Sequence, residues 1–357
     1  MSTDAFADRI FASVLGTMDC LTIALGDRLG LYDVLAEHGP LVASELARRA
    51  GIDERYAREW LEQQAVAGLV EIARPSTDAA VREYALSEAQ REVLCDRSLE
   101  SYLTPLTQVL AAAGAQLPAL EEAYRTGGGV GWAAYGPHMR LGQADANRAL
   151  FLTSLPRSWL PAIPALHERL TEGTRVADIG CGDGWSSIGI ASGYPRTTVE
   201  GFDLDAGSVA AAQENASAQG VADRVTFRHA DAGTVEDARG YGLVTAFECV
   251  HDMPDPVSVL ATMRAMADPD GWVLVVDERV PDEFTGPGDP VEQLMYGYSV
   301  LVCLPDGMSH RPTRATGTVM RPDVLRGYAR EAGFADIEVL PIENDVFRVY
   351  RLCTVTS

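Results

Sequence analysis

Glycines spaced as GxGxG near the middle of the 357-residue chain form its clearest ligand-binding pattern. The stretch VADIGCGDGW places Asp178, Gly180 and Gly182 where a short apolar run ends and a helix is expected to begin. Glycine at such a turn lets a ligand approach the backbone, because no Cβ stands in the way. The dinucleotide motif GxGxxG needs a small residue at its sixth position, and this chain has Trp185 there. The turn therefore indicates an adenosine ligand other than NAD.

Acidic residues follow the next apolar runs of the chain. GFDLD contains Asp203, whose carboxylate can accept hydrogen bonds from both hydroxyls of a ribose, with Leu204 beside it. HADA offers Asp231 and the backbone of Ala232 to an adenine, and AFEC contains Glu248. Each acid taken singly could instead cap a helix N-terminus. Three acids behind a glycine turn favour a cofactor-binding edge.

Short β-rich runs alternate with helical patterns from Thr174 onward and indicate the fold that positions these residues. Such alternation predicts a parallel sheet with helices on both faces, so the fold class is α/β. Two further strands are expected near residues 337–340 and 346–352. Ligands bind at the carboxyl edge of the strands in open α/β sheets, and the residues above fall at that edge together with His251.

The N-terminal part has a different pattern. Residues 41–72 predict a helix, a turn, a helix and a strand, and a second strand returns near Tyr84, which is the order of a winged helix. DNA binding is one interpretation, and a dimerisation or substrate-cap module is the other. The second helix carries Arg55 and Arg58 among three glutamates, so its surface has no net positive charge. A helix that lies beside phosphates needs such charge, and the second interpretation is therefore favoured.

Composition excludes several classes of function. The chain has no lysine, so Schiff-base aldolases, pyridoxal-phosphate enzymes and P-loop NTPases, which need one, are ruled out. A formal net charge of −22 disfavours nucleic acid as a partner, because that affinity comes from basic residues. The six cysteines show no zinc-ligand spacing, so we expect no metal and a reducing, cytoplasmic location.

No membrane association is expected either. Residues 101–120 carry no charge and are numerous enough to span a bilayer, but they include prolines, glutamines and threonines. We interpret them as helix buried within the protein. The N-terminus has acidic residues where a signal peptide would carry basic and then apolar ones.

These motifs together resemble the class I S-adenosylmethionine-dependent methyltransferases, and most of all the winged-helix branch that includes caffeic acid and hydroxyindole O-methyltransferases. DIGCGDG is similar to the first motif of that class, and VHDMPD is similar to the HDWPD-type motif of the branch. The resemblance covers nearly the whole chain in order. It implies a Rossmann-like sheet of seven strands with the last antiparallel, joined to an N-terminal α-helical winged-helix domain. It also implies S-adenosyl-L-methionine as cofactor, S-adenosyl-L-homocysteine as product and no metal.

The resemblance further implies roles for individual residues. His251 corresponds to the general base, and Glu278 in VVDERVPD corresponds to a glutamate that supports this histidine. A second supporting glutamate of the family falls on Val319, so the resemblance implies a His251–Glu278 pair and not a full triad. A homodimer is implied, with Phe6–Leu35 as its interface. The substrate residues are expected to be Trp132, Tyr135, His138, Met295, Tyr298 and Met308.

Three segments follow from these patterns. We expect a helical winged-helix dimerisation domain at 1–90, a helical linker or substrate cap at 91–170, and a cofactor-binding methyltransferase domain at 171–357 with a substrate insertion at 280–314. An insertion and cap rich in aromatic and apolar residues favour a small-molecule acceptor over a macromolecule.

The leading functional prediction is O-methylation of a small aromatic or lipophilic secondary metabolite. A phenol is mostly neutral at pH 7, and an imidazole can take its proton during attack on the methyl group. One alternative is N-, C-, S- or carboxyl methylation by proximity alone, with His251 only orienting the acceptor. A second alternative is a winged-helix regulator that senses S-adenosylmethionine.

Overall fold

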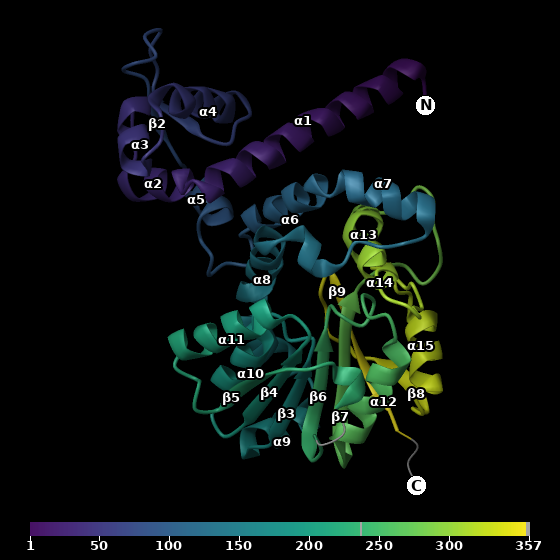
Figure 1. Ribbon diagram of the computed structural model, residues 1–357. Coiled ribbons are helices and arrows are strands. Elements are labelled where there is room, and N and C mark those ends of the chain that lie inside the picture. Colours follow the sequence, from purple (N-terminus) through teal and green to yellow (C-terminus); the bar gives the residue numbers. More distant parts are fainter. Residues whose placement is uncertain (236–237, 355–357) are drawn as a thin grey trace. The chain divides into compact units, whose positions relative to one another are not determined.

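The computed structural model describes residues 1–235 and 238–354 and forms two compact units (Figure 1). The N-terminal unit comprises Met1–Gly114 and Pro137–Ala149, and the C-terminal unit comprises Ala115–Gly136 and Leu150–Ser357. The helical segment expected at 91–170 is therefore divided between the two units. Each unit has a hydrophobic core of its own.

The N-terminal unit contains a helix–turn–helix followed by a two-stranded antiparallel wing. Gly51, with φ of 69°, ends one helix, and the Asp53 side chain accepts a hydrogen bond from the backbone nitrogen of Arg55 to begin the next. The winged helix indicated by the sequence is thus confirmed. The elements are α1 (Thr3–Arg28), α2 (Leu31–His38), α3 (Ala43–Ala50), α4 (Glu54–Val66), β1 (Glu71–Arg74), β2 (Glu83–Ala85), α5 (Glu88–Leu94), α6 (Thr104–Ala115) and α8 (Pro137–Leu152), of which α6 and α8 run past the unit's bounds.

Helix α1 is the one described helix whose length and composition would allow it to cross a membrane. A single such helix near the N-terminus is weak evidence for a membrane protein. The uncharged segment at 101–120 forms two shorter helices instead, because the chain turns at Gln116. Helix α6 has 12 residues, whereas about 20 are needed to span a bilayer.

The C-terminal unit is built on a seven-stranded sheet with the order β5-β4-β3-β6-β7-β9-β8. The first five strands in that order are parallel, and β9 is antiparallel to both of its neighbours. The Rossmann-like α/β fold with an antiparallel last strand is therefore confirmed. The strands are β3 (Arg175–Ile179), β4 (Thr198–Asp203), β5 (Val225–His229), β6 (Tyr241–Phe247), β7 (Ala267–Glu278), β8 (Asp336–Val339) and β9 (Phe347–Cys353).

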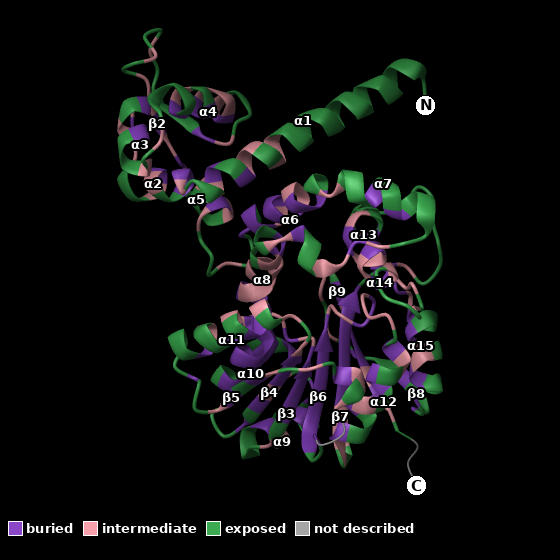
Figure 2. Cartoon of the chain, viewed as in Figure 1, coloured by how far each residue is buried: buried purple, intermediate pink, exposed green. Residues whose placement is uncertain are grey.

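Helices cover this sheet, and its central strands are the most buried part of the unit (Figure 2). Helices α10 and α11 pack against β4 and β5, α12 packs against β6 and β7, and α15 packs against β8. The helices of the unit are α7 (Leu117–Thr126), η1 (Trp132–Tyr135), η2 (Leu155–Trp159), α9 (Pro164–Glu172), α10 (Trp185–Gly193), α11 (Ala206–Ala218), η3 (Ala232–Thr234), α12 (Pro256–Met266), α13 (Pro290–Tyr298), η4 (Ser299–Cys303), α14 (Leu304–Met308) and α15 (Pro322–Glu331).

Candidate active site

The turn between β3 and α10 presents bare backbone at the carboxyl edge of the sheet. Gly180 and Gly182 have φ of 65° and 51°, in the left-handed region that favours glycine. A Cβ on Gly180 would lie 2.7 Å from the Cys249 sulfur, so a side chain does not fit there. Around Gly182, by contrast, no atom lies within 4 Å of the position that a Cβ would take. The turn is therefore closed toward the sheet and open above Gly182.

Asp178 holds this turn from below. Its carboxylate is fully buried and accepts hydrogen bonds from the hydroxyls of Ser186 at 2.6 Å, Ser187 at 2.7 Å and Thr245 at 2.8 Å. Burial raises the pKa of Asp178 against the opposing effect of these three donors. The sequence suggested a direct contact between Asp178 and a cofactor, but the geometry gives it the role of tying the turn to α10 and β6.

The other acids at this edge are more accessible. One oxygen of Asp203 accepts from the Gly182 nitrogen at 2.8 Å and the other from the Asp205 nitrogen at 2.8 Å, which fixes the carboxylate. Leu204 beside it is 60% exposed. Asp231 accepts from the Gly233 nitrogen at 2.9 Å and caps η3, which is the capping alternative left open by the sequence, and its side chain stays exposed.

Glu248, at the end of β6, has a strained backbone. Its φ is 51°, and Ala315 is the one other non-glycine residue with positive φ among residues 1–235 and 238–354. Its nitrogen donates to the Val276 carbonyl at 2.8 Å, so the strained position is held by the sheet. Such strain persists where the surrounding structure over-determines it, and it often marks a functional turn. This turn carries the chain from β6 toward His251.

His251 is 2% exposed and is surrounded by three carboxylates. Its Nδ1 is hydrogen-bonded to Oδ1 of Asp277 at 3.0 Å and lies 3.2 Å from Oε2 of Glu278. Its Nε2 lies 3.2 Å from Oδ1 of Asp252. The carboxylate of Asp277 can only accept when ionised, so Nδ1 carries the proton of a neutral ring and the lone pair lies on Nε2.

The charges around His251 decide its protonation. Burial lowers its pKa, but the negative charges of Asp252, Asp277 and Glu278 outweigh burial and hold the pKa well above its ordinary value of 6.5. Burial also raises the pKa of the Glu278 carboxyl, and the neighbouring Asp277 charge adds to that rise. The cluster therefore places a buried imidazolium among carboxylates, and burial favours the protonated form of Glu278.

Sequence reasoning paired His251 with Glu278, and the two side chains do lie together. It missed Asp277, which precedes Glu278 on β7 and makes the better hydrogen bond. Successive side chains of a strand point to opposite faces, so the alternation pattern does not reveal that both Asp277 and Glu278, at the end of β7, contact the histidine. The family's second supporting glutamate falls on Val319 in this sequence, and the adjacent Thr318 has a buried hydroxyl.

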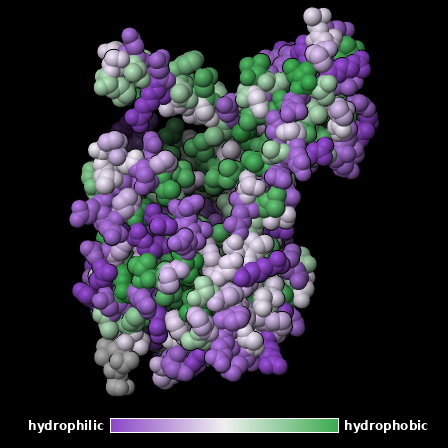
Figure 3. Space-filling view, turned by 180° about the vertical axis from the view of Figure 1, so that it is seen from behind, coloured by the Kyte–Doolittle hydropathy of each residue, from purple (hydrophilic) through white to green (hydrophobic). Residues whose placement is uncertain are grey.

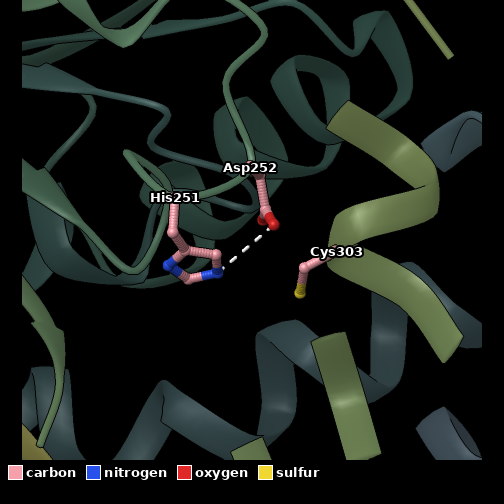
Figure 4. Close-up of side chains that lie close together, drawn as sticks. All are labelled: His251, Asp252 and Cys303. Carbon is pink, nitrogen blue, oxygen red and sulfur yellow. Dashed lines mark ion pairs between the residues drawn. The ribbon is translucent and has the colours of Figure 1, made fainter. Parts of the chain in front are cut away.

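Cys303 and Asp306 were also missed. Cys303 ends η4, and its sulfur lies within 4.8 Å of a ring nitrogen of His251 and of a carboxylate oxygen of Asp252 (Figure 4). Asp306, one helical turn later, accepts from the Trp132 nitrogen at 2.8 Å. Burial and the nearby Asp252 charge raise the pKa of Asp306 to about 7. No spacing in the sequence joins the 303–306 segment to His251.

The expected substrate residues are distributed unevenly. Tyr135 donates to the Leu301 carbonyl at 2.7 Å and, with Trp132, fixes η1 against η4 and α14. Met295 is buried, while Tyr298 and Met308 are half-buried on α13 and α14. His138 is exposed and belongs to the N-terminal unit.

Two family models match the chain. A methyltransferase domain matches residues 170–300, and an Rv2258c-like winged HTH domain matches residues 17–96. The ubiquinone biosynthesis O-methyltransferase of Bordetella bronchiseptica is 31% identical over 189 residues, which is 52% of this chain and 72% of that protein. The protein of the same name from Leptothrix cholodnii is 32% identical over 190 residues, covering 52% and 75%. The chain belongs to the S-adenosylmethionine-dependent methyltransferases.

Solved structures show the same fold along the whole chain. Human N-acetylserotonin methyltransferase in complex with SAM has a TM-score of 0.72 at 17% identity, covering 100% of this chain and 99% of that one. The mitomycin 7-O-methyltransferase MmcR has a TM-score of 0.70 at 17% identity, covering 99% and 98%. PigF with SAH has a TM-score of 0.72 at 16% identity, covering 99% of each chain.

The residues of this methyltransferase fit the cofactor of its family. The open space above Gly182 lies beside Asp203, whose two oxygens are fixed by backbone donors and keep lone pairs for hydroxyl groups. The exposed side chain of Leu204 provides an apolar surface next to that carboxylate. A ribose and an aromatic base need these two kinds of contact.

Proposed function

We propose that this methyltransferase transfers the methyl group of S-adenosylmethionine to a hydroxyl oxygen of a small aromatic or lipophilic metabolite, with His251 as the general base. The observation that carries the proposal is the hydrogen bond of 3.0 Å between Nδ1 of His251 and Asp277. That bond holds the ring in the tautomer whose Nε2 can accept a proton. A hydroxyl acceptor needs a base, whereas methylation by proximity alone does not.

The protonation of His251 sets the conditions for this chemistry. Only the neutral ring can accept a proton, and the three carboxylates favour the charged ring at neutral pH. The same carboxylates stabilise the imidazolium that forms when the acceptor loses its proton, so they favour the transition state as well. We therefore expect a strong base whose rate rises with pH well above the ordinary pKa of a histidine.

Residues at the glycine turn and at the ends of β4 and β5 would hold the cofactor. Asp203 would bind the ribose hydroxyls, Asp231 and the Ala232 backbone would face the adenine, and Leu204 would pack on its ring. When bound, S-adenosylmethionine supplies an electrophilic methyl group on a sulfonium. Gly180, Gly182 and the strained turn at Glu248 shape the backbone around that position.

The charges near His251 favour a particular acceptor. Asp252 and Asp306 are acidic, and among the described residues the one cationic side chain within 4 Å of Asp252 is His251 itself. A carboxylated acceptor would be repelled by this cluster. A second hydroxyl or an amine would instead find hydrogen-bond acceptors there. The apolar side chains of Met295, Tyr298 and Met308 fit the lipophilic part of such a molecule.

Methyl transfer from isotopically labelled S-adenosylmethionine tests the proposal. We expect label on a phenolic hydroxyl, and more rapid transfer to a catechol than to a catechol bearing a carboxylate. His251→Gln should slow transfer by about 10²–10⁴-fold with cofactor affinity unchanged. The matched control is His38→Gln, on the surface of α2. A rate for His251→Gln within a few-fold of the parent would contradict the base role.

A homodimer that forms through α1 completes the proposal. Apolar side chains are exposed along this helix; they are Phe6, Ile10, Phe11, Val14, Leu15, Met18, Leu21 and Leu25. The space-filling view shows hydrophobic side chains in green gathered on the surface of the upper part of the molecule (Figure 3). Monomeric proteins rarely expose so continuous an apolar surface. Light scattering at assay concentration should give twice the monomer mass, and a monomer throughout would contradict it.

Neither nucleic acid nor membrane is part of the proposal, and we place the protein in the cytoplasm. On the winged helix, α4 carries Glu54, Glu59 and Glu62 against Arg55 and Arg58, and Arg55 is paired with Glu59, so this helix has no net positive charge for phosphates. All six cysteines are free thiols, which suits a reducing compartment.

A further inference from the structure

Three side chains of different donor types converge at the proposed base. A ring nitrogen of His251, a carboxylate oxygen of Asp252 and Sγ of Cys303 all lie within 4.8 Å of one another (Figure 4). Nε2 of His251 is 3.2 Å from Oδ1 of Asp252. His251 and Asp252 come from the loop after β6, and Cys303 comes from the end of η4, so the chain brings two distant segments together. An imidazole nitrogen, a carboxylate oxygen and a sulfur are the ligands of zinc sites in proteins.

The surroundings of these atoms suit a cation. Asp277 accepts the Nδ1 proton of His251 at 3.0 Å, which directs the Nε2 lone pair toward Asp252 and Cys303. Metal-binding histidines are oriented by a carboxylate in this way. Oδ1 of Asp252 is buried and accepts no hydrogen bond among the described residues. Among the residues that the structure describes, His251 is the only side chain that forms an ion pair with the nearby carboxylates of Asp277 and Glu278.

We propose that His251, Asp252 and Cys303 bind one zinc-class divalent cation, and that this cation inhibits methyl transfer. Sulfur and imidazole ligands select such an ion over magnesium or calcium. When the metal–sulfur bond forms, the thiol proton leaves to solvent, and a proton on Nε2 leaves when that nitrogen binds the metal. The cation then holds the lone pair that the base needs. Metal binding goes beyond the proposed function, and only the inhibition rests on it.

Cobalt(II) is the probe that separates binding from activity. Titration of the purified full-length protein with Co²⁺ should produce a near-ultraviolet sulfur-to-cobalt charge-transfer band that saturates at one ion per chain. Added Zn²⁺ should remove the band. Cys303→Ser should abolish it, and Asp252→Asn should weaken Co²⁺ binding about tenfold or more. Cys353→Ser, which changes a half-buried thiol on β9, is the matched control and should keep the band.

The activity measurement follows on the same samples. Zn²⁺ should inhibit the parent enzyme reversibly, with activity restored by a chelator, and Cys303→Ser should need at least about tenfold more Zn²⁺ relative to its own metal-free rate. A missing band, or one that survives in a folded Cys303→Ser protein, would overturn the metal site. A normal band with no inhibition would overturn only the regulatory part. A band in a protein that transfers no methyl group would support the site and count against the proposed function.

Discussion

Two acidic regions of the same sheet edge solve the problem of buried charge in opposite ways. At the cofactor rim, which we define as residues 178–184 and 203–205, the carboxylates of Asp178 and Asp203 accept hydrogen bonds from neutral donors: three hydroxyls for Asp178 and two backbone nitrogens for Asp203. In the histidine cluster, which we define as His251, Asp252, Asp277, Glu278 and Cys303, three carboxylates share one imidazole.

The difference separates stability from chemistry. Buried acids with full sets of hydrogen bonds rigidify a structure, and removing one leaves its donors unpaired. Acids crowded around one titratable ring repel one another, shift the pKa of the ring and stabilise its charged form when it accepts a proton. Oxygens of Asp277 and Glu278 are buried there without a hydrogen-bond partner among the described residues. We therefore expect the rim to govern folding and the cluster to govern rate.

The largest effect should come from Asp277. Asp277→Asn keeps the size of the side chain but removes the charge that holds the proton on Nδ1, so we expect kcat to fall by about 10²–10⁴-fold. The KM values for cofactor and acceptor should change little, because Asp277 acts through His251 and touches neither. Steady-state kinetics measures the effect on catalysis, and the melting temperature measures the effect on stability. A fall in stability with kcat preserved would reverse the roles we assign to the two regions.

The next effect is on stability at Asp178. Asp178→Ala leaves the hydroxyls of Ser186, Ser187 and Thr245 without their acceptor, so the free energy of unfolding should fall by about 2–4 kcal/mol. Asp178→Asn keeps the shape and one acceptor oxygen, and burial already disfavours the charge, so its loss should be smaller. Denaturant unfolding compares the pair. Equal losses in both variants would mean that charge, not hydrogen bonding, holds the turn.

The sequence predicted the rim better than the cluster, and the reason is physical. The glycine turn, Asp203 and Leu204 are set by the backbone within a few residues of a strand end, so spacing alone locates them. His251 also follows a strand closely. Asp277 contacts it only because β6 and β7 pair in parallel register, and Cys303 only because η4 folds back on that edge. Such contacts depend on tertiary structure.

The sequence pattern predicted the strands and helices of the fold more completely than it predicted where the chain divides into units. Alternating strands and helices predicted the five parallel strands, and two further β-rich runs predicted β8 and β9. The chain passes between the two units three times, and α8 is continuous across the last of these changes, at Leu150. Helical periodicity predicts which face of a helix is buried, but it does not predict to which of the two units the helix belongs.

A shift in pH dependence is the third expected effect. The rate should rise with pH through the pKa of His251, which lies well above 6.5, because only the neutral ring accepts a proton. Asp252→Asn removes the strongest of the carboxylate effects that raise this pKa, while burial still lowers it. The rising limb should therefore move to lower pH by about one unit. Asp255→Asn, at the N-cap of α12, is the control and should leave the limb in place. An unmoved limb in Asp252→Asn would mean that His251 is not the titrating base.

The smallest effect sharpens the comparison at the rim itself, where Gly182 has a matched control in Gly220, which follows α11 and lies outside the rim. Both have positive φ, 51° and 69°, and both have open space where a Cβ would be. Alanine at either position adopts a conformation it disfavours, so each variant should lose about 1 kcal/mol of unfolding free energy. Only Gly182→Ala places a methyl group beside Asp203, so only this variant should weaken S-adenosylmethionine binding, by about tenfold, in calorimetry. Equal cofactor affinities in the two variants would show that the open space above Gly182 holds no ligand, and the cofactor contacts would then have to be sought at the other strand ends.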